Sequence, residues 1–287
     1  MHSSRRLMSS NSKLFALLSC LLLLSSVPAY AAESDHRLSQ GVAVAVGAGL
    51  EVTTGDYGNT ADATIVTMPV LIAVNPSDNS DLTLEIPLVY LSSRSSSDVV
   101  VTRSGGIGRR SRSVSTTSTT SSTTTTSATG LGDINLSAGW TLLHDDELTP
   151  RIRPMIYLKA PTGDDDRGLG TGTFEGGAGL SLSKWFGDFQ LFGEAAYVMQ
   201  NSTTDYQGKN YVSYSAGGGM QATDRLFVTV YGRGSSARIE GGDAPLEGRL
   251  KLNFLQSRRV VWELYGLVGF SDASPAGGGG FLMMYQF

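Results

Sequence analysis

Ionisable side chains stand singly in segments that are apolar at alternate positions, and they fall almost entirely on one face of those segments. Carboxylates and cations on a shared face could hold the polar groups of a solute through ion pairs and hydrogen bonds. They could also pair with one another and close the space between them, so both alternatives stay open. The candidates are Glu85, Arg153, Lys159, Glu194, Arg233, Arg249, Lys251 and Glu263.

A run of three acidic residues, Asp164, Asp165 and Asp166, offers the oxygen ligands that hard cations prefer. Three adjacent aspartates cannot all point at one ion, and the neighbouring Gly163 and Gly168 favour a turn. We therefore expect no metal at this site, and the sequence indicates no other cofactor.

Histidine is scarce, which bears on enzymatic chemistry. Hydrolysis of the serine type needs a histidine beside a serine or an aspartate. Beyond the first residues the chain has only His36, in an N-terminal tail, and His144, beside a short turn. We expect a protein that is not an enzyme.

The segments that must position the charged residues have a period of two, which is typical of strands with one apolar face. They are Val42–Thr53, Ala63–Val74, Leu82–Ser92, Asp133–Leu143, Arg151–Ala160, Phe174–Lys184, Phe189–Gln200, Tyr211–Ala222, Leu226–Ala237, Leu246–Leu255, Val260–Ser271 and Gly279–Phe287. Each is close to the roughly 9–11 residues that a tilted membrane strand needs. The apolar face would meet lipid, where a charge at the midplane costs about 2–4 kcal/mol, and the charged face would line a lumen. We predict an all-β fold, an antiparallel up-and-down transmembrane β-barrel of about 12 strands.

The connections alternate in length. Short polar turns are predicted at Asn75–Asp81, His144–Pro150, Gly187–Asp188, Thr223–Arg225 and Gln256–Arg259. Longer loops are predicted at Thr54–Asp62, Ser93–Thr129, Pro161–Thr173, Asn201–Asn210, Arg238–Pro245 and Asp272–Gly278. Outer-membrane barrels have short periplasmic turns and long outer loops, so we expect both chain ends on the periplasmic side.

The N-terminus indicates export. Basic residues precede an apolar run, Leu14–Leu24, which is too short for a membrane span, and small residues suited to cleavage follow it. We place the cut between Ala31 and Ala32, so residues 1–31 are predicted to be a signal peptide. Residues 32–287 are predicted to form a single outer-membrane β-barrel domain. A short anchoring helix at the N-terminus is the alternative.

Cleavage would remove Cys20, the only cysteine, together with three positive charges. The mature chain would then need no disulfide and no cysteine-bound metal, as suits an oxidising compartment. The net charge is −4 before cleavage and would become more negative after it, which argues against a nucleic-acid partner.

A Ser/Thr-rich segment at residues 93–129 is predicted to be a long outer loop. Ser115–Ser127 consists only of serine and threonine, with too little apolar surface to order itself. Arg109, Arg110 and Arg112 lie in the same loop, where they would contact lipopolysaccharide phosphates or remain a solvated surface.

The chain ends in an alternating apolar segment that closes with Tyr285 and Phe287. This ending resembles the C-terminal signature that the bacterial barrel-assembly machinery recognises. We therefore predict that both residues form an assembly signal.

Four motifs between Gly130 and Gly187 form a fingerprint: GLGD begins a strand, PTGD ends another, LGTG follows, and SKWFG closes the next. Their order resembles the MetA-pathway (meta-pathway) phenol-degradation family of bacterial outer-membrane β-barrel, transporter-like proteins. The resemblance implies a barrel associated with the catabolism of aromatic compounds. The Ser/Thr-rich insertion Ser95–Thr129 departs from the family pattern.

These features predict an outer-membrane channel or transporter for small, hydrophobic or aromatic solutes, which would enter by passive or facilitated diffusion. The expected partners are outer-membrane lipid and lipopolysaccharide, the barrel-assembly machinery and a small-molecule solute. The alternatives are a closed, structural barrel without transport and, less favoured, an outer-membrane enzyme.

Overall fold

A computed structural model describes residues 42–57, 63–95, 99–104, 106–111, 124–202, 208–239 and 241–287. The wall strands are β1 (Ala43–Gly55), β2 (Ala63–Ser77), β3 (Ser80–Ser95), β6 (Thr124–Leu131), β7 (Ile134–Trp140), β8 (Arg151–Ala160), β9 (Glu175–Phe186), β10 (Phe189–Gln200), β11 (Tyr211–Thr223), β12 (Leu226–Ser235), β13 (Leu246–Leu255), β14 (Val260–Gly269) and β15 (Gly277–Gln286). A separate hairpin consists of β4 (Val99–Ser104) and β5 (Gly106–Ser111). The described residues form no helix with the length and hydropathy of a membrane span.

The wall closes because β1 pairs antiparallel with β2 on one side and with β15 on the other. Every other wall strand pairs with its neighbours in chain order, and β6 and β7 share one place because both pair with β3. Closure gives each wall strand a partner on both sides, except β6, which pairs only with β3. The predicted antiparallel barrel of twelve strands is confirmed, with ends that differ from the predicted ones by a few residues.

The two faces of the wall differ in exposure. On β14 and β15 the outward Leu264 and Phe281 are 53% and 41% exposed, whereas the inward Glu263 and Leu282 are 3% and 4% exposed. The outward face is apolar around the barrel, as lipid requires. The charged side chains of the wall strands therefore point mainly into the interior of the barrel.

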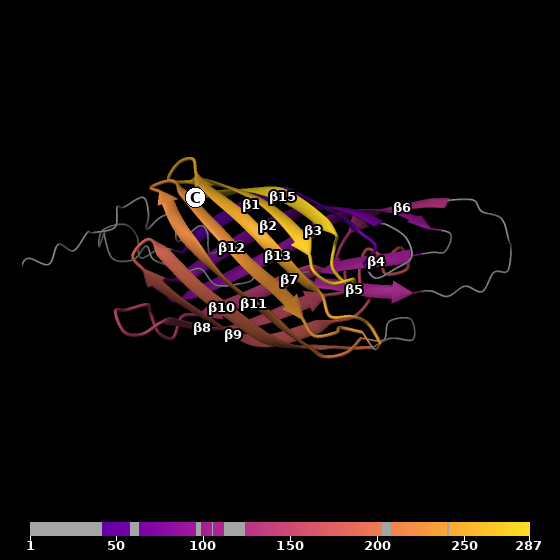
Figure 1. Cartoon of the computed structure of the whole chain (residues 1–287), viewed down its shortest axis with the longest axis horizontal. Helices are drawn as coiled ribbons and strands as arrows, with labels where there is room; N and C mark the ends of the chain where they lie inside the picture. Colours follow the sequence, from indigo (N-terminus) through magenta and orange to yellow (C-terminus); the bar gives the residue numbers. More distant parts are fainter. Residues whose placement is uncertain are drawn as a thin grey trace, which may run out of the picture.

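The two ends of the barrel differ as the loop lengths predict. Short turns such as Gly187–Asp188 join strands at one end, called here the short-turn end. The other end, called the long-loop end, holds connections such as that between β8 and β9. In Figure 1 the β4–β5 hairpin and β6 extend beyond the barrel at the right, and the C-terminus lies at the opposite end.

The predicted loop at residues 93–129 contains strands, namely β4, β5 and most of β6. The expectation that the Ser/Thr-rich composition cannot order itself is wrong for β6. Residues Thr124–Leu131 pair with Leu88–Ser95 of β3. Main-chain hydrogen bonds to an existing strand do not need apolar side chains, and threonine suits the extended backbone.

The fourth wall strand is interrupted between β6 and β7, where a single strand, Asp133–Leu143, was predicted. Pro87 of β3 lies beside the break and cannot donate to a ladder. The Gly132 N–H still donates to the Pro87 carbonyl at 2.8 Å. Asp133 leaves the ladder, and its carboxylate binds residues of the β8–β9 connection instead.

Candidate functional site

A cavity of about 250 Å³ lies in the lumen of the barrel. Its lining includes six of the eight charged residues that the sequence placed on the inner face, Glu85, Glu194, Arg233, Arg249, Lys251 and Glu263. Inward tyrosines, among them Tyr157, Tyr211, Tyr231 and Tyr265, share the lining with smaller polar and apolar side chains. The cavity can therefore offer a solute charges of both signs and aromatic rings.

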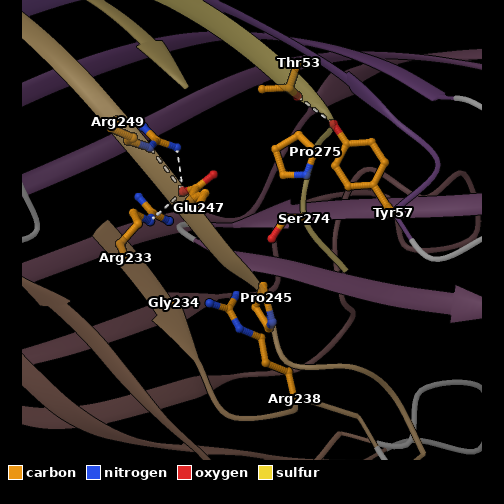
Figure 2. Close-up of a pocket in the computed structure, with 10 residues that line it drawn as sticks. All are labelled: Thr53, Tyr57, Arg233, Gly234, Arg238, Pro245, Glu247, Arg249, Ser274 and Pro275. Carbon is orange, nitrogen blue, oxygen red and sulfur yellow. Dashed lines mark hydrogen bonds and ion pairs between the residues drawn. The ribbon is translucent and has the colours of Figure 1, made fainter. Parts of the chain in front are cut away.

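On the side formed by β12 and β13 the charges are paired (Figure 2). Arg233 Nε and Arg249 Nη2 lie 2.9 and 3.0 Å from the same atom, Glu247 Oε1. Arg249 also lies 3.6 Å from Glu51 of β1, which accepts a hydrogen bond from Tyr265. Glu247 was not among the predicted residues, although it stands two positions from Arg249 on the same face.

A second ion pair crosses from β13 to β14. Lys251 Nζ lies 2.9 Å from Glu263 Oε2, and both side chains are nearly fully buried. The same ammonium lies 5.9 Å from the centre of the Tyr231 ring. On β10, two strands from β12, Glu194 Oε2 is buried without a hydrogen-bond partner among the described residues. The cavity lining therefore includes a carboxylate oxygen of Glu194 that no described group hydrogen-bonds.

The other two predicted residues lie inside the barrel but outside the cavity lining. Arg153 of β8 forms a two-point ion pair with Asp81, with Nε 2.8 Å from Oδ1. Gly139 makes room for its guanidinium, because a Cβ there would lie 2.0 Å from Nη2. Lys159, near the long-loop end, contacts Glu175 and Asp133. Both cations belong to fixed internal contacts.

Three of the fingerprint motifs meet at Asp133. Its Oδ1 accepts from the Gly163 N–H at 3.1 Å, and its Oδ2 accepts from the Thr171 N–H at 2.9 Å. Thr162 of PTGD donates its hydroxyl to the Gly132 carbonyl at 2.8 Å. The fingerprint therefore fixes the β8–β9 connection to the wall. The order of the motifs in the sequence could not identify these contacts.

The fixed connection reaches inward. Leu169 is 1% exposed and packs with Tyr57, Ile65 and other buried residues at the long-loop end. Gly170 permits this path, because a Cβ there would lie 2.4 Å from Asp133 Oδ1. The connection therefore narrows the long-loop end of the lumen.

Toward the short-turn end the cavity meets a group of buried apolar side chains, called here the apolar layer. It consists of Ala45, Leu71, Phe227, Leu255, Val261, Leu282 and Met284, with Trp185 packed against them. Leu71 and Leu282 also line the cavity. This layer was not predicted, although residues 281–284 are apolar on both faces of their strand.

Glycines allow two members of the apolar layer, Phe227 and Met284, to lie flat on the wall. A Cβ at Gly219 would lie 2.4 Å from the Phe227 ring, and a Cβ at Gly47 would lie 2.0 Å from Met284 Sδ. Glycine inside a strand often marks such a close approach.

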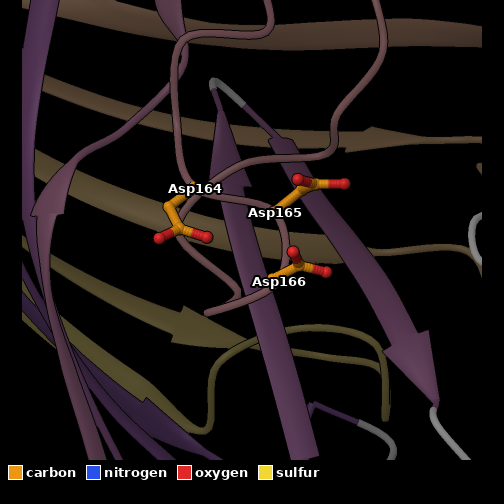
Figure 3. Close-up of side chains that lie close together, drawn as sticks. All are labelled: Asp164, Asp165 and Asp166. Carbon is orange, nitrogen blue, oxygen red and sulfur yellow. The ribbon is translucent and has the colours of Figure 1, made fainter.

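The three acidic residues of the β8–β9 connection lie close together (Figure 3). One carboxylate oxygen from each of Asp164, Asp165 and Asp166 lies within 4.8 Å of the others, closer than we expected for adjacent aspartates. The turn brings them together, and Asp164 Oδ1 accepts from the Arg167 N–H at 3.1 Å. Asp164 and Asp166 are exposed, and exposed acidic groups often gather without an ion.

Among the residues that the structure describes, none of the remaining predicted residues lines the cavity. Arg109 and Arg110 belong to β5, whereas Arg112 lies outside the described residues, as do His36, Cys20 and the predicted signal peptide. His144 bonds Asn79 at 2.8 Å between two short turns. At the end of β15 the rings of Tyr285 and Phe287 meet edge to face at 5.1 Å.

Known structures share this fold. The crystal structure of the COG4313 outer membrane channel from Pseudomonas putida F1 is 13% identical, with a TM-score of 0.58 over 88% of this chain and 98% of that chain. The translocator domain of the autotransporter NalP from Neisseria meningitidis is 13% identical, with a TM-score of 0.47 over 88% and 90%. The Ralstonia pickettii toluene transporter TbuX is 10% identical, with a TM-score of 0.39 over 87% and 90%.

The barrel fold and its apolar outer face place the chain in the outer membrane. No curated protein sequence matches the chain. A family model described as "Putative MetA-pathway of phenol degradation" matches residues 79–244, more than half of the 287 residues. The match includes the GLGD, PTGD, LGTG and SKWFG motifs, so the chain belongs to this family.

Proposed function

We propose that this protein is an outer-membrane channel through which small, hydrophobic or aromatic solutes enter by passive or facilitated diffusion. The observation that supports it most is the lumen cavity of about 250 Å³. Binding cavities combine apolar and aromatic walls with a few polar groups that orient the ligand. The cavity here has both kinds of lining.

The aromatic part of the proposal is supported by rings that stand beside charges. The guanidinium of Arg249 lies 5.5 Å from the centre of the Tyr265 ring, and Lys251 stands similarly over Tyr231. Rings held in this way present faces and edges to a planar solute. The apolar layer below the cavity would favour solutes that give up water readily and would impede hydrated ions.

A combined experiment tests the proposal: conductance of the purified protein in planar bilayers, and uptake of phenol into liposomes that contain it. We expect uptake above that of protein-free liposomes, together with a small conductance. Lys251→Met should shift the ion preference toward cations, because it removes a positive charge from the lumen. Lys209→Met, which removes an exposed loop charge, is the matched control.

The ion pairs support a second candidate, a closed barrel with a structural role. Arg233 and Arg249 each form an ion pair with Glu247, and Lys251 forms one with Glu263, which leaves fewer charged groups for a solute. Absence of both conductance and uptake would favour this candidate and would overturn the channel.

The proposal orients the barrel with its short-turn end in the periplasm. Arg109, Arg110 and Arg112 would then contact lipopolysaccharide phosphates. Lipopolysaccharide should protect this segment from trypsin, whereas equal cleavage with and without it would argue against the contact.

A further inference from the structure

Arg238 follows β12 at the long-loop end and lines the lumen cavity. Its Nε donates to Ser235 Oγ at 2.9 Å, and its guanidinium carbon lies 4.6 Å from the centre of the Tyr211 ring. The Nε edge of the guanidinium therefore bonds Ser235, and one of its faces packs on the Tyr211 ring. No described residue hydrogen-bonds or ion-pairs with Nη1 or Nη2 of this arginine.

The supports of Arg238 are themselves fixed. The Tyr211 hydroxyl donates to Glu175 Oε2 at 3.0 Å, which holds the ring under the guanidinium. The Arg238 carbonyl accepts from the Lys209 N–H at 2.8 Å and from the Gln200 side-chain amide. The Nη end of the guanidinium is thus presented in a set orientation, and a ligand would not have to order it.

In the lining of one small part of this end, arginines outnumber carboxylates. A small hollow of about 30 Å³ beside the cavity is lined by three arginines, Arg233, Arg238 and Arg249, and by one carboxylate, Glu247. In Figure 2 Glu247 is bonded to Arg233 and Arg249, whereas Arg238 stands apart from that group. The surroundings of Arg238 therefore favour an anion.

We propose that Arg238 is the anion-binding residue of a lumen subsite for small aromatic carboxylates. Its two Nη atoms form a planar fork that matches the two oxygens of a carboxylate. Arg238 borders both the hollow and the cavity, whose lining also includes Val198 and Tyr231. A carboxylate held on the fork would leave its ring in the cavity.

This inference deepens the proposed function, because the subsite lies in the lumen of the proposed channel. Binding can nevertheless be measured without transport, so the two can fail separately. The test is equilibrium binding by calorimetry to the purified barrel in detergent micelles. The probes are benzoate, its neutral analogue benzamide, and two anions without a ring, acetate and inorganic phosphate.

We expect benzoate to bind more tightly than the other three probes. Arg238→Gln should weaken benzoate binding about ten-fold or more and leave benzamide unchanged, because it removes a charge-assisted two-point contact. Arg238→Lys keeps the positive charge but lacks the two Nη donors, so its benzoate affinity should lie between that of the unmodified protein and that of Arg238→Gln. The control is Arg225→Gln, at an exposed arginine of a short turn. It should bind benzoate with the same affinity as the unmodified protein.

Equal binding of benzoate and benzamide, or unchanged benzoate affinity in Arg238→Gln, would overturn the subsite. Acetate or phosphate binding as tightly as benzoate would overturn the aromatic class. Heat-modifiable gel mobility reports whether each variant is folded. If Arg238→Gln does not fold, the benzoate affinity of Arg238→Lys decides whether the subsite exists. If benzoate binds at Arg238 but the barrel shows no conductance, the subsite would be supported and only the channel proposal would be contradicted.

Discussion

The ammonium of Lys159 lies 3.3 Å from the carboxylate of Asp133, and neither side chain is exposed to solvent. Asp133 belongs to GLGD, and it also binds main-chain groups of the later PTGD and LGTG motifs. These family motifs therefore mark a connection that is fixed inside the barrel. Their described contacts are internal, and the cavity charges come from other strands.

Asp133→Asn should destabilise the barrel by about 3 kcal/mol, because removing one partner of a buried ion pair leaves the other uncompensated. The contact between Lys159 and Glu175 remains and limits the loss. Urea unfolding in lipid vesicles measures the change. Asp166→Asn, in the same connection but exposed, should stay within about 0.5 kcal/mol of the unmodified protein. Equal shifts for the two variants would contradict the role given to Asp133.

The strands could be predicted because lipid imposes a strict rule on them. A period of two with charges confined to one face is what a lipid-facing wall requires, and the predicted β8, β10 and β13 match the observed strands residue for residue. The break at Asp133 could not be predicted, because it depends on Pro87 of another strand. The strand β6 could not be predicted, because segments rich in serine and threonine usually stay unordered.

The site was harder to predict than the fold. Alternation tells which face a side chain takes, but not its height in the lumen or its neighbours across the wall. Glu247 joins Arg233 to Arg249 only through the register of β12 on β13. The apolar layer could not be predicted for the same reason, since its members come from several strands, among them Phe227 of β12 and Met284 of β15, and cluster only in the folded barrel.

Met284→Ala should raise the ion conductance several-fold, because it removes a buried side chain from the apolar layer and leaves room for water. The measurement is single-channel recording in planar bilayers. Met283→Ala is a matched control, because its side chain leaves the same strand on the lipid side and is 37% exposed. The same conductance in both variants would mean that the layer does not limit ion flow.

Burial raises the pKa of Tyr57 at the long-loop end from 10.0 to about 12. The folded state therefore keeps the phenol neutral at a pH where the unfolded chain ionises it. Its contribution to stability is complete below pH 10 and is lost as the pH rises toward 12. Unfolding of the unmodified protein and of Tyr57→Phe, compared from about pH 8 to 12, should show their stability difference changing only above pH 10. A constant difference over this range would contradict the assigned shift.

Phe287→Ala should lower the amount of assembled barrel in cells more than it lowers the stability of the purified protein. The Phe287 N–H donates to the Val44 carbonyl at 3.0 Å, a bond that any residue can make, whereas the ring is 74% exposed. Apart from its edge-to-face contact with Tyr285, the ring is largely exposed in the folded structure, which leaves it available for recognition during assembly. Heat-modifiable mobility of outer-membrane fractions measures assembly, and Phe270→Ala, a similarly exposed phenylalanine after β14, is the control. If both variants lose the same amount of assembled barrel, assembly depends on exposed apolar surface in general and not on a phenylalanine at the C-terminal position.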